Sequence, residues 1–177
     1  LERAREHILA HCLEEKVKCR LSDGFEKYQT DEADTAVIAG MGGDLMEKIL
    51  MEGKDRLPKE LILQPQSEWF KVRRFLNKYG YRIVKEDMVL EDGKYYQIIK
   101  AQAGAEQTFS TLQEAYGPCL LQERHPVLKR YLQDTTASYE TIRERLEKVA
   151  TISAAKRRTE IADEIVKLKG ALAYYEM

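Results

Sequence analysis

The chain contains 177 residues, of which 44% are hydrophobic and 33% are charged. This length suits one domain, or a small domain with an appendage, and the apolar content is sufficient for a hydrophobic core. The 29 Lys and Arg residues nearly balance the 30 Asp and Glu residues, so the net charge of -1 excludes a global attraction to nucleic acid and requires a local basic patch for any such binding.

The cysteines and the hydropathy pattern restrict the cellular setting. Cys12, Cys19 and Cys119 form no CxxC pair, and their odd number argues against a disulfide framework. No apolar run is long enough to span a membrane, and no signal peptide is visible. We therefore expect a cytoplasmic protein with no membrane partner. The chain starts at Leu1 inside a helical pattern, so we interpret it as the later part of a longer protein.

The N-terminal third predicts a helix, two strands and a second helix. Residues 1–16 contain neither Pro nor Gly and carry apolar side chains at helical spacing. Residues 17–21 alternate as a strand does, and the apolar run 33–39 predicts a strand buried on both faces, as in a parallel sheet. A helix then begins, with Asp44 as its expected N-cap and Glu47 completing a capping box.

The middle of the chain continues the alternation of strand and helix. Residues 60–64 predict a third strand that ends at Pro65. Residues 67–79 predict a helix with Ser67 as its N-cap. Two strand-like runs within 81–101 flank the dipeptide Asp92-Gly93, which is a strong signal for a hairpin. This order predicts an α/β sheet that is mostly parallel with an antiparallel edge.

After Gly104 the composition changes to one typical of long helices. An apolar stripe with steps of 4 and 3 predicts helices that pack on each other, and it contains Leu128, Leu132, Thr135, Tyr139, Ile142, Leu146 and Val149, then Ile161, Ile165, Leu168, Leu172 and Tyr175. The stripe breaks between its two parts, which predicts two antiparallel helices joined near 151–156. We expect two domains, an α/β domain over 1–105 and a helical coiled-coil hairpin over 106–177.

The stretch Gly40-Met41-Gly42-Gly43 separates a predicted strand from the helix that follows it directly. Glycine permits a positive φ and lets another molecule approach the backbone, so the stretch is either a tight turn or a ligand-binding loop. It lacks the last glycine of GxGxxG, and no P-loop motif is present. An acidic residue at the helix start repels anions, so a ligand here would be neutral or cationic at the contact point.

Four motifs together resemble the bacterial tRNA adenine(22)-N1-methyltransferases. They are Ser22-Asp23-Gly24-Phe25, Ile38-Ala39-Gly40-Met41-Gly42-Gly43, Leu61-Ile62-Leu63-Gln64-Pro65 and Glu91-Asp92-Gly93-Lys94-Tyr95-Tyr96, in matching order and spacing. The resemblance covers nearly all of the chain. It implies a class I, Rossmann-like enzyme that depends on S-adenosylmethionine (SAM), with tRNA as its partner and a C-terminal coiled coil.

The resemblance also implies a set of site residues. Asp23, Gly24 and Phe25 would contact the adenine of the cofactor, and Ala39, Gly40, Met41 and Gly42 would line the cofactor near its methyl group. Gly40, Met41, Gln64 and Pro65 would form the catalytic site, with no metal. The family carries a further strand–loop–strand segment, absent here, that holds the methionine and ribose parts of SAM.

Methylation of adenine N1 makes modest demands on acid–base chemistry. The nitrogen is neutral and has its own lone pair, so positioning and the exclusion of water can supply most of the acceleration. We expect Gln64 to read the Watson–Crick edge of the base, Pro65 to hold the turn rigid, and the target adenine to leave its stack.

Basic and aromatic side chains offer contacts for RNA. Two basic clusters either contact phosphate or form solvated faces: Lys71, Arg73, Arg74 and Lys78 on one predicted helix, and Lys156, Arg157 and Arg158 at the tip of the helical hairpin. Trp69, Tyr95 and Tyr96 could stack on bases, although packing is the reading we favour. His7 and His11 have no third ligand in view, so we expect no metal site.

Two other functions compete with this interpretation. One is a class I methyltransferase with a protein or small-molecule substrate, and the other is a noncatalytic RNA-binding or coiled-coil scaffold. The sequence leaves the tRNA species and the oligomeric state open and is compatible with a monomer.

The usual class I strand order generates a prediction for the isolated chain. Two strands of the family segment would lie between the strands at 17–21 and 33–39, so residues 1–177 alone would have unpaired sheet edges and an incomplete pocket. We expect weak SAM binding and a tendency to aggregate. Tight, stoichiometric binding of SAM in isothermal titration calorimetry would contradict this expectation.

Overall fold

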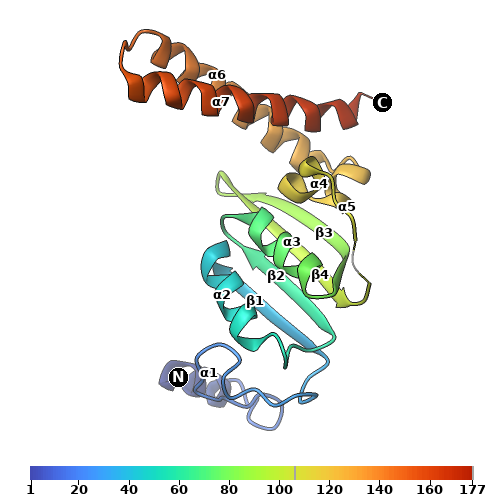
Figure 1. Ribbon diagram of the computed structural model, residues 1–177. Helices are drawn as coiled ribbons and strands as arrows, with labels where there is room; N and C mark the ends of the chain where they lie inside the picture. The colour runs from blue at the N-terminus through green and yellow to red at the C-terminus, as the bar shows by residue number, and fades with distance from the viewer. Residues whose placement is uncertain (106, 177) are drawn as a thin grey trace.

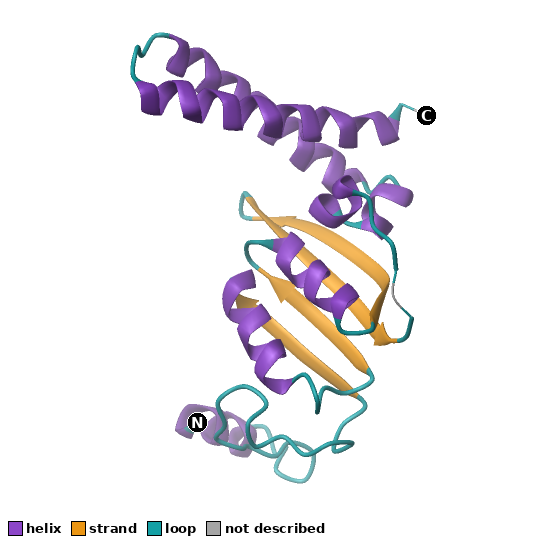
Figure 2. Cartoon of the chain, viewed as in Figure 1, coloured by secondary structure: helices purple, strands orange, loops and turns teal. Residues whose placement is uncertain are grey.

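The computed structural model describes residues 1–105 and 107–176 (Figures 1 and 2). A four-stranded sheet carries α2 and α3 on one face, and a pair of long helices extends beyond the sheet. In chain order the elements are α1 (Glu2–Ala10), β1 (Thr35–Met41), α2 (Gly43–Gly53), β2 (Glu60–Pro65), α3 (Trp69–Lys78), β3 (Tyr81–Glu91), β4 (Lys94–Ala103), α4 (Thr111–Tyr116), α5 (Pro118–Gln122), α6 (Pro126–Glu147), α7 (Ile152–Leu172) and the 3₁₀ turn η1 (Ala173–Tyr175).

The sheet has the strand order β1-β2-β4-β3. β1 and β2 are parallel, whereas β4 is antiparallel to both β2 and β3. The expected hairpin is therefore confirmed, and its turn places Asp92 at φ 49° and Gly93 at φ 74°, the positive values that a tight hairpin turn requires. The expectation of a mostly parallel sheet was wrong, because only one of these three strand pairs is parallel.

The N-terminal segment differs most from the sequence prediction. α1 ends at Ala10 rather than at residue 16, and residues 17–21 form no strand. A strand is held by hydrogen bonds to a neighbour, and within the described residues no strand pairs with this segment. β1 is consequently an edge strand, and Val37 is 68% exposed, so the predicted burial of that strand on both faces was also wrong.

The two helices on the sheet begin without the predicted side-chain caps. Gly42 is the N-cap of α2 and Glu68 that of α3, so the roles expected for Asp44 and Ser67 were wrong. The carbonyl of Ser67 instead accepts a hydrogen bond from the N–H of Gly43 at 3.1 Å, which satisfies one of the free donors at the start of α2. The carboxylate of Asp44 forms an ion pair with Lys71 on α3.

The long helices α6 and α7 run antiparallel alongside each other (Figure 1). The turn between them lies at 148–151, slightly before the predicted join. Burial supports part of the predicted stripe: Leu128, Leu132, Ile161, Ile165 and Leu168 are buried, whereas Ile142 is 37% and Val149 is 46% exposed. Coiled-coil packing along the whole hairpin therefore stays a prediction.

Two apolar cores hold these parts together. The first lies between the sheet and helices α2 and α3, whose apolar positions fall at helical spacing, for example Val72, Phe75 and Leu76. The second joins Met88 of β3 to helices α4 to α7. The second core thus contains residues from both sides of the predicted domain boundary. That boundary stays a prediction, and residue 106 lies outside the described residues.

A buried ion pair connects the helical part to the sheet. Arg73 of α3 is 0% exposed, and its Nε donates to Glu86 of β3 at 2.8 Å. Nη1 donates to the carbonyls of Glu114 and Ala115 at 3.1 Å each, and Nη2 donates to Gln97 of β4. A guanidinium so enclosed is unavailable to RNA, so the expected phosphate contact of Arg73 was wrong.

The network predicts a large asymmetry between neighbouring arginines. Arg73→Met should lower the free energy of unfolding by about 3–5 kcal/mol, because it leaves the buried carboxylate of Glu86 without its partner. Arg74→Met is the matched control, since Arg74 pairs with Glu114 at 2.5 Å while its side chain stays 63% exposed, and we expect a loss below about 1 kcal/mol. Urea unfolding measures both, and equal losses would contradict the role of the buried pair.

Candidate functional site

The carboxyl ends of β1 and β2 meet at one point of the sheet. Ala39 pairs with Gln64 and Met41 pairs with Pro65, and the register shifts between these two pairs at Gly40. The expected catalytic residues therefore lie together, at the edge where ligands bind in open α/β sheets. Gly42 follows directly as the N-cap of α2.

The glycines of this loop serve different purposes. Gly40 has a φ of +81°, and a Cβ built there would meet no atom within 4 Å. Gly43 is a packing glycine, because a Cβ there would lie 2.4 Å from the carbonyl oxygen of Ser67. The tight-turn interpretation thus explains Gly43, whereas the open space beside the backbone at Gly40 fits a ligand lying against it.

Gln64 stabilises the unusual conformation of Gly40. The N–H of Gly40 donates to Oε1 of Gln64 at 2.9 Å. Because a backbone N–H can only donate, this bond identifies the oxygen and leaves Nε2 as the other amide atom. Nε2 is buried and has no hydrogen-bond partner, a costly state for an amide donor. The side chain therefore has unused donor capacity at the strand ends.

The residues expected to hold the cofactor's adenine lie elsewhere. Asp23 lines a cavity of about 290 Å³ with Glu26, Glu52 and Arg56, near the last turn of α2. Met41 precedes the first turn of that 11-residue helix, whereas Asp23 lies near its last turn. The two residues are therefore separated by roughly 15 Å along the helix axis. The expected convergence of Asp23 with Met41 and Gln64 on one cavity was therefore wrong for this structure.

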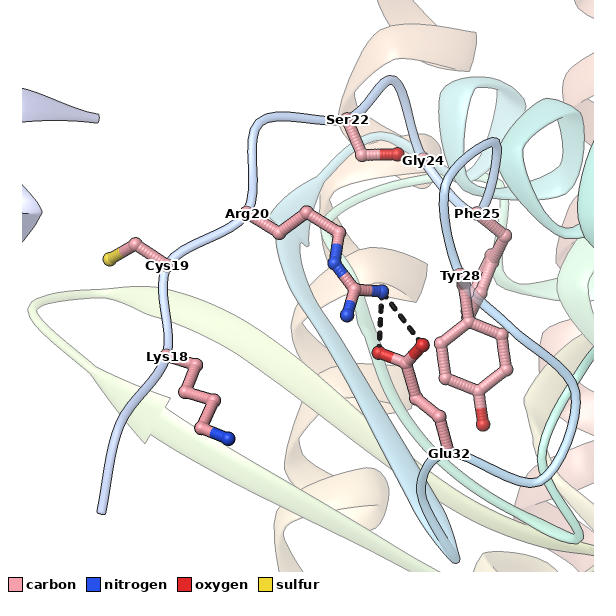
Figure 3. A pocket seen from close by; sticks show the side chains of 8 residues that line it. All are labelled: Lys18, Cys19, Arg20, Ser22, Gly24, Phe25, Tyr28 and Glu32. Atoms are coloured by element: carbon pink, nitrogen blue, oxygen red, sulfur yellow. Dashed lines mark hydrogen bonds and ion pairs between the residues drawn. The ribbon is translucent and has the colours of Figure 1, made fainter. Parts of the chain in front are cut away.

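A second cavity of about 520 Å³ contains the other two predicted residues, Gly24 and Phe25 (Figure 3). Arg20 and Glu32 form an ion pair across it at 2.6 Å. Gly24 and Phe25 also pack on α2, because a Cβ at Gly24 would lie 3.0 Å from Ile49. With no strand to hold it, this segment takes its position from contacts with α2, so a cofactor role for Asp23, Gly24 and Phe25 stays a prediction.

The basic cluster on α3 is largely neutralised within the molecule. Besides the buried Arg73, Lys71 pairs with Asp44, and Arg74 pairs with Glu114. The bond to Asp44 raises the pKa of Lys71. Lys78 lies over the ring of Tyr79, 5.4 Å from its centroid. Phosphate binding by Lys71, Arg74 and Lys78 stays a prediction, and Lys71 and Arg74 already have carboxylate partners.

The cluster at the hairpin tip is more open. Lys156 and Arg157 are exposed, and Arg157 forms an exposed pair with Glu160 at 2.9 Å. Arg158 is partly buried. The tip lies far from the sheet (Figure 1), so its side chains are free to meet a large partner.

An aromatic cavity beside the strand ends was missed by the sequence interpretation. It has a volume of about 410 Å³ and is lined by Gln66, Trp69, Lys94, Tyr95, Tyr96 and Tyr131. The sequence favours packing for Trp69, Tyr95 and Tyr96 and gives no specific role to Tyr131. The sequence places these aromatic residues in separate elements, and only the fold brings them together.

The described residues contain no group of three or more His, Cys, Asp or Glu side chains arranged to hold a metal ion. No helix among them has both the length and the apolar character needed to cross a membrane.

Comparison with known proteins identifies the family. A family model described as tRNA (adenine(22)-N(1))-methyltransferase, TrmK, matches residues 1–170. The enzyme of that name from Bacillus subtilis is 33% identical over 175 residues, which cover 94% of this chain and 73% of the relative.

Solved structures agree with this match. A protein from Listeria monocytogenes superposes with a TM-score of 0.91 at 26% identity, covering 97% of this chain and 77% of that one. A Streptococcus pneumoniae protein is described as a putative tRNA (m1A22) methyltransferase in complex with S-adenosyl-L-methionine. It superposes with a TM-score of 0.82 at 32% identity, and the match covers 96% of this chain and 74% of that one. The chain belongs to the TrmK family of tRNA (adenine(22)-N(1))-methyltransferases.

Proposed function

We propose that the chain methylates N1 of the adenine at position 22 of tRNA, with SAM as the methyl donor. The family match and the SAM-bound relative from Streptococcus pneumoniae support this function over a noncatalytic scaffold or a different methyl acceptor. The observation that carries the proposal is the bond between Gly40 and Gln64, which joins two strand ends beside open space.

The site is suited to a reaction that depends on position. SAM, when bound, supplies an electrophilic methyl group on a sulfonium. The chain has to hold adenine N1 in line with that methyl group and exclude water, and it need not remove a proton first. The exposed backbone at Gly40 can lie against a ligand because no Cβ projects from it. Met41 and Pro65 hold the two strand ends in register.

Gln64 has a more specific role in this proposal than its sequence suggests. Its Oε1 already accepts the N–H of Gly40, so its first task is to hold the loop. A carbonyl oxygen has a second lone pair, which is free for the exocyclic amino group of adenine, and Nε2 remains available for an acceptor. Gln64 must not donate to adenine N1, because that would occupy the lone pair that forms the new bond.

The remaining parts of the proposal follow from charge and redox state. The tip cluster of Lys156, Arg157 and Arg158 would contact tRNA phosphates at a distance from the reacting base. The three cysteines are free, which suits a reducing cytoplasm. Burial raises the pKa of Cys119 to about 11, so its thiol is protonated and unreactive at neutral pH.

Substitution of Gln64 tests the catalytic role. In the complete protein, Gln64→Ala should lower the methylation rate by about 100-fold, because the loop at Gly40 loses the group that positions it. Binding of SAM, measured by calorimetry, should persist. Gln64→Glu keeps an acceptor for the N–H of Gly40 and should recover about tenfold of the loss.

The matched control is Gln102→Ala. Gln102 pairs with Glu60 at the opposite end of β2, where its Nε2 donates to that carboxylate at 2.9 Å. This variant should methylate tRNA at the unchanged rate. A Gln64→Ala enzyme as fast as the Gln102→Ala control would reject the role of Gln64.

Salt dependence tests the tip cluster. Replacement of Lys156, Arg157 and Arg158 by Gln should weaken binding to any tRNA. In a plot of the logarithm of the tRNA association constant against the logarithm of the salt concentration, the magnitude of the slope should fall by about 2–3. A control with Lys48, Lys54 and Lys59 replaced by Gln removes the same charge from exposed positions on the sheet part. Equal salt slopes for the two triple variants would place the RNA elsewhere.

A further inference from the structure

Two loops meet at the strand ends and are hydrogen-bonded to each other. The first joins β1 to α2, and the second, residues 66–68, joins β2 to α3. The backbone N–H of Gln66 donates to the carbonyl of Met41 at 2.9 Å, and the N–H of Gly43 donates to the carbonyl of Ser67 at 3.1 Å. The position of the second loop therefore sets the position of the first, which is the loop proposed above for methyl transfer.

The second loop contains a residue in an unfavourable conformation. Glu68, the N-cap of α3, has a φ of +45°, and its side chain makes no capping hydrogen bond. A residue with a Cβ keeps this left-handed conformation only where its surroundings hold it. Gln66 and Glu68 are themselves exposed, so burial of the loop supplies little restraint. The restraint has to come from the residues at the two ends of the loop.

The side chain of Trp69 closes this loop. Its indole N–H donates to the carbonyl of Pro65 at 3.0 Å, so one bond joins the residue before the loop to the residue after it. An indole N–H can only donate, and this bond is partly buried. A phenylalanine or leucine at position 69 could fill space but could not form the bond.

The indole ring is held in turn by the helical part of the molecule. Its centroid lies 5.3 Å from that of Tyr131 on α6, and the ring of Tyr131 lies 5.2 Å from that of Tyr95 on β4 in an edge-to-face arrangement. The hydroxyl of Tyr95 donates to Asp134, also on α6, at 2.6 Å. Trp69 therefore contacts the strand-end loops on one side and the docked helices on the other.

Two features distinguish Trp69 from a residue that only fills space. It is partly buried at the margin of the second core, and its polar atom is directed back to the end of β2. The next residue, Phe70, shows the contrast, because it is 38% exposed and its ring centroid lies 5.5 Å from the guanidinium of Arg74. Phe70 is thus an aromatic residue of the same helical turn that can serve as a control.

We propose that Trp69 is a positioning residue for methyl transfer, which fixes the two strand-end loops against the helical part. The backbone at Gly40 and Met41 is then held at a set position relative to the basic tip of α6 and α7. The inference rests on the proposed function and deepens it, because a reaction that depends on placement can lose about 100-fold in rate when the reacting groups are displaced by about 1 Å. In this role Trp69 acts through the loops and touches neither SAM nor the base.

Steady-state kinetics of the complete protein give the first test. Trp69→Phe keeps a ring against Tyr131 but cannot donate to Pro65, so kcat should fall roughly tenfold while KM for tRNA stays within about twofold. Trp69→Leu also loses the ring contact and should lower kcat by roughly 100-fold. Phe70→Leu should leave both constants unchanged.

A matched variant separates positioning from a general loss of stability. Tyr139→Leu also removes a ring at the margin of the second core, but Tyr139 lies about two turns further along α6 than Tyr131. This variant should unfold at a lower urea concentration than the unchanged protein and keep its kcat. A fall in kcat that follows the loss of stability equally in Tyr139→Leu and Trp69→Leu would reduce Trp69 to a packing residue and overturn the inference.

Hydrogen exchange tests the link without turnover. In Trp69→Phe the backbone N–H of Gly43 should exchange about tenfold faster, because the loop that carries its acceptor, the carbonyl of Ser67, is held less firmly. In Tyr139→Leu it should exchange at the unchanged rate.

The outcomes are distinguishable. Unchanged exchange at Gly43 in Trp69→Phe, or an unchanged kcat in Trp69→Leu, would each overturn the inference and leave the methyltransferase function intact. If the unchanged protein fails to methylate adenine in tRNA, the proposed function is wrong and a role of Trp69 in that reaction fails with it, whatever the exchange rate of Gly43.

Discussion

The buried pair of Arg73 and Glu86 is the interaction on which the arrangement of this molecule depends. One guanidinium donates to a carboxylate on β3, to an amide on β4 and to two carbonyls of α4, so it joins the sheet to the helical part. Glu86 also accepts the N–H of Cys119 in α5 at 3.0 Å. Such a network is costly to desolvate and costly to break, so it specifies one relative position of the parts it connects. Gly117 is required beside it, since a Cβ there would lie 2.6 Å from Glu86.

That position has a direct consequence for chemistry. With α4 and α5 held against β3, α6 starts where Tyr131 can reach Trp69 and Tyr95. The aromatic cavity thus exists because the helical part is docked on the hairpin. The same docking projects the basic tip of α6 and α7 away from the sheet (Figure 1), where a large, negatively charged substrate can contact both regions.

At the strand ends, the proposed site is built from main-chain geometry rather than from acid–base groups. Gly40 adopts a positive φ, Gln64 holds its N–H, and Ser67 accepts the N–H of Gly43. These contacts bring β1, β2, α2 and α3 to one point and leave the backbone accessible. Methylation of a neutral ring nitrogen needs such placement more than it needs a base, so a site without paired carboxylates is consistent with the family's reaction.

The sequence by itself determined the local features of this protein. The strand that leads into the glycine loop, the Asp92-Gly93 hairpin and the long apolar-striped helices follow from backbone preferences and periodicity, which are properties of neighbouring residues. The motifs also identified the family, because they record the order of the loops. Only the tertiary structure decided that Arg73 is buried, that 17–21 forms no strand, that Asp23 lies apart from Gln64, and that aromatics from α3, β4 and α6 share a cavity. Each of these depends on which distant segments become neighbours, and a strand, an ion pair or a cavity exists only when its partner is present.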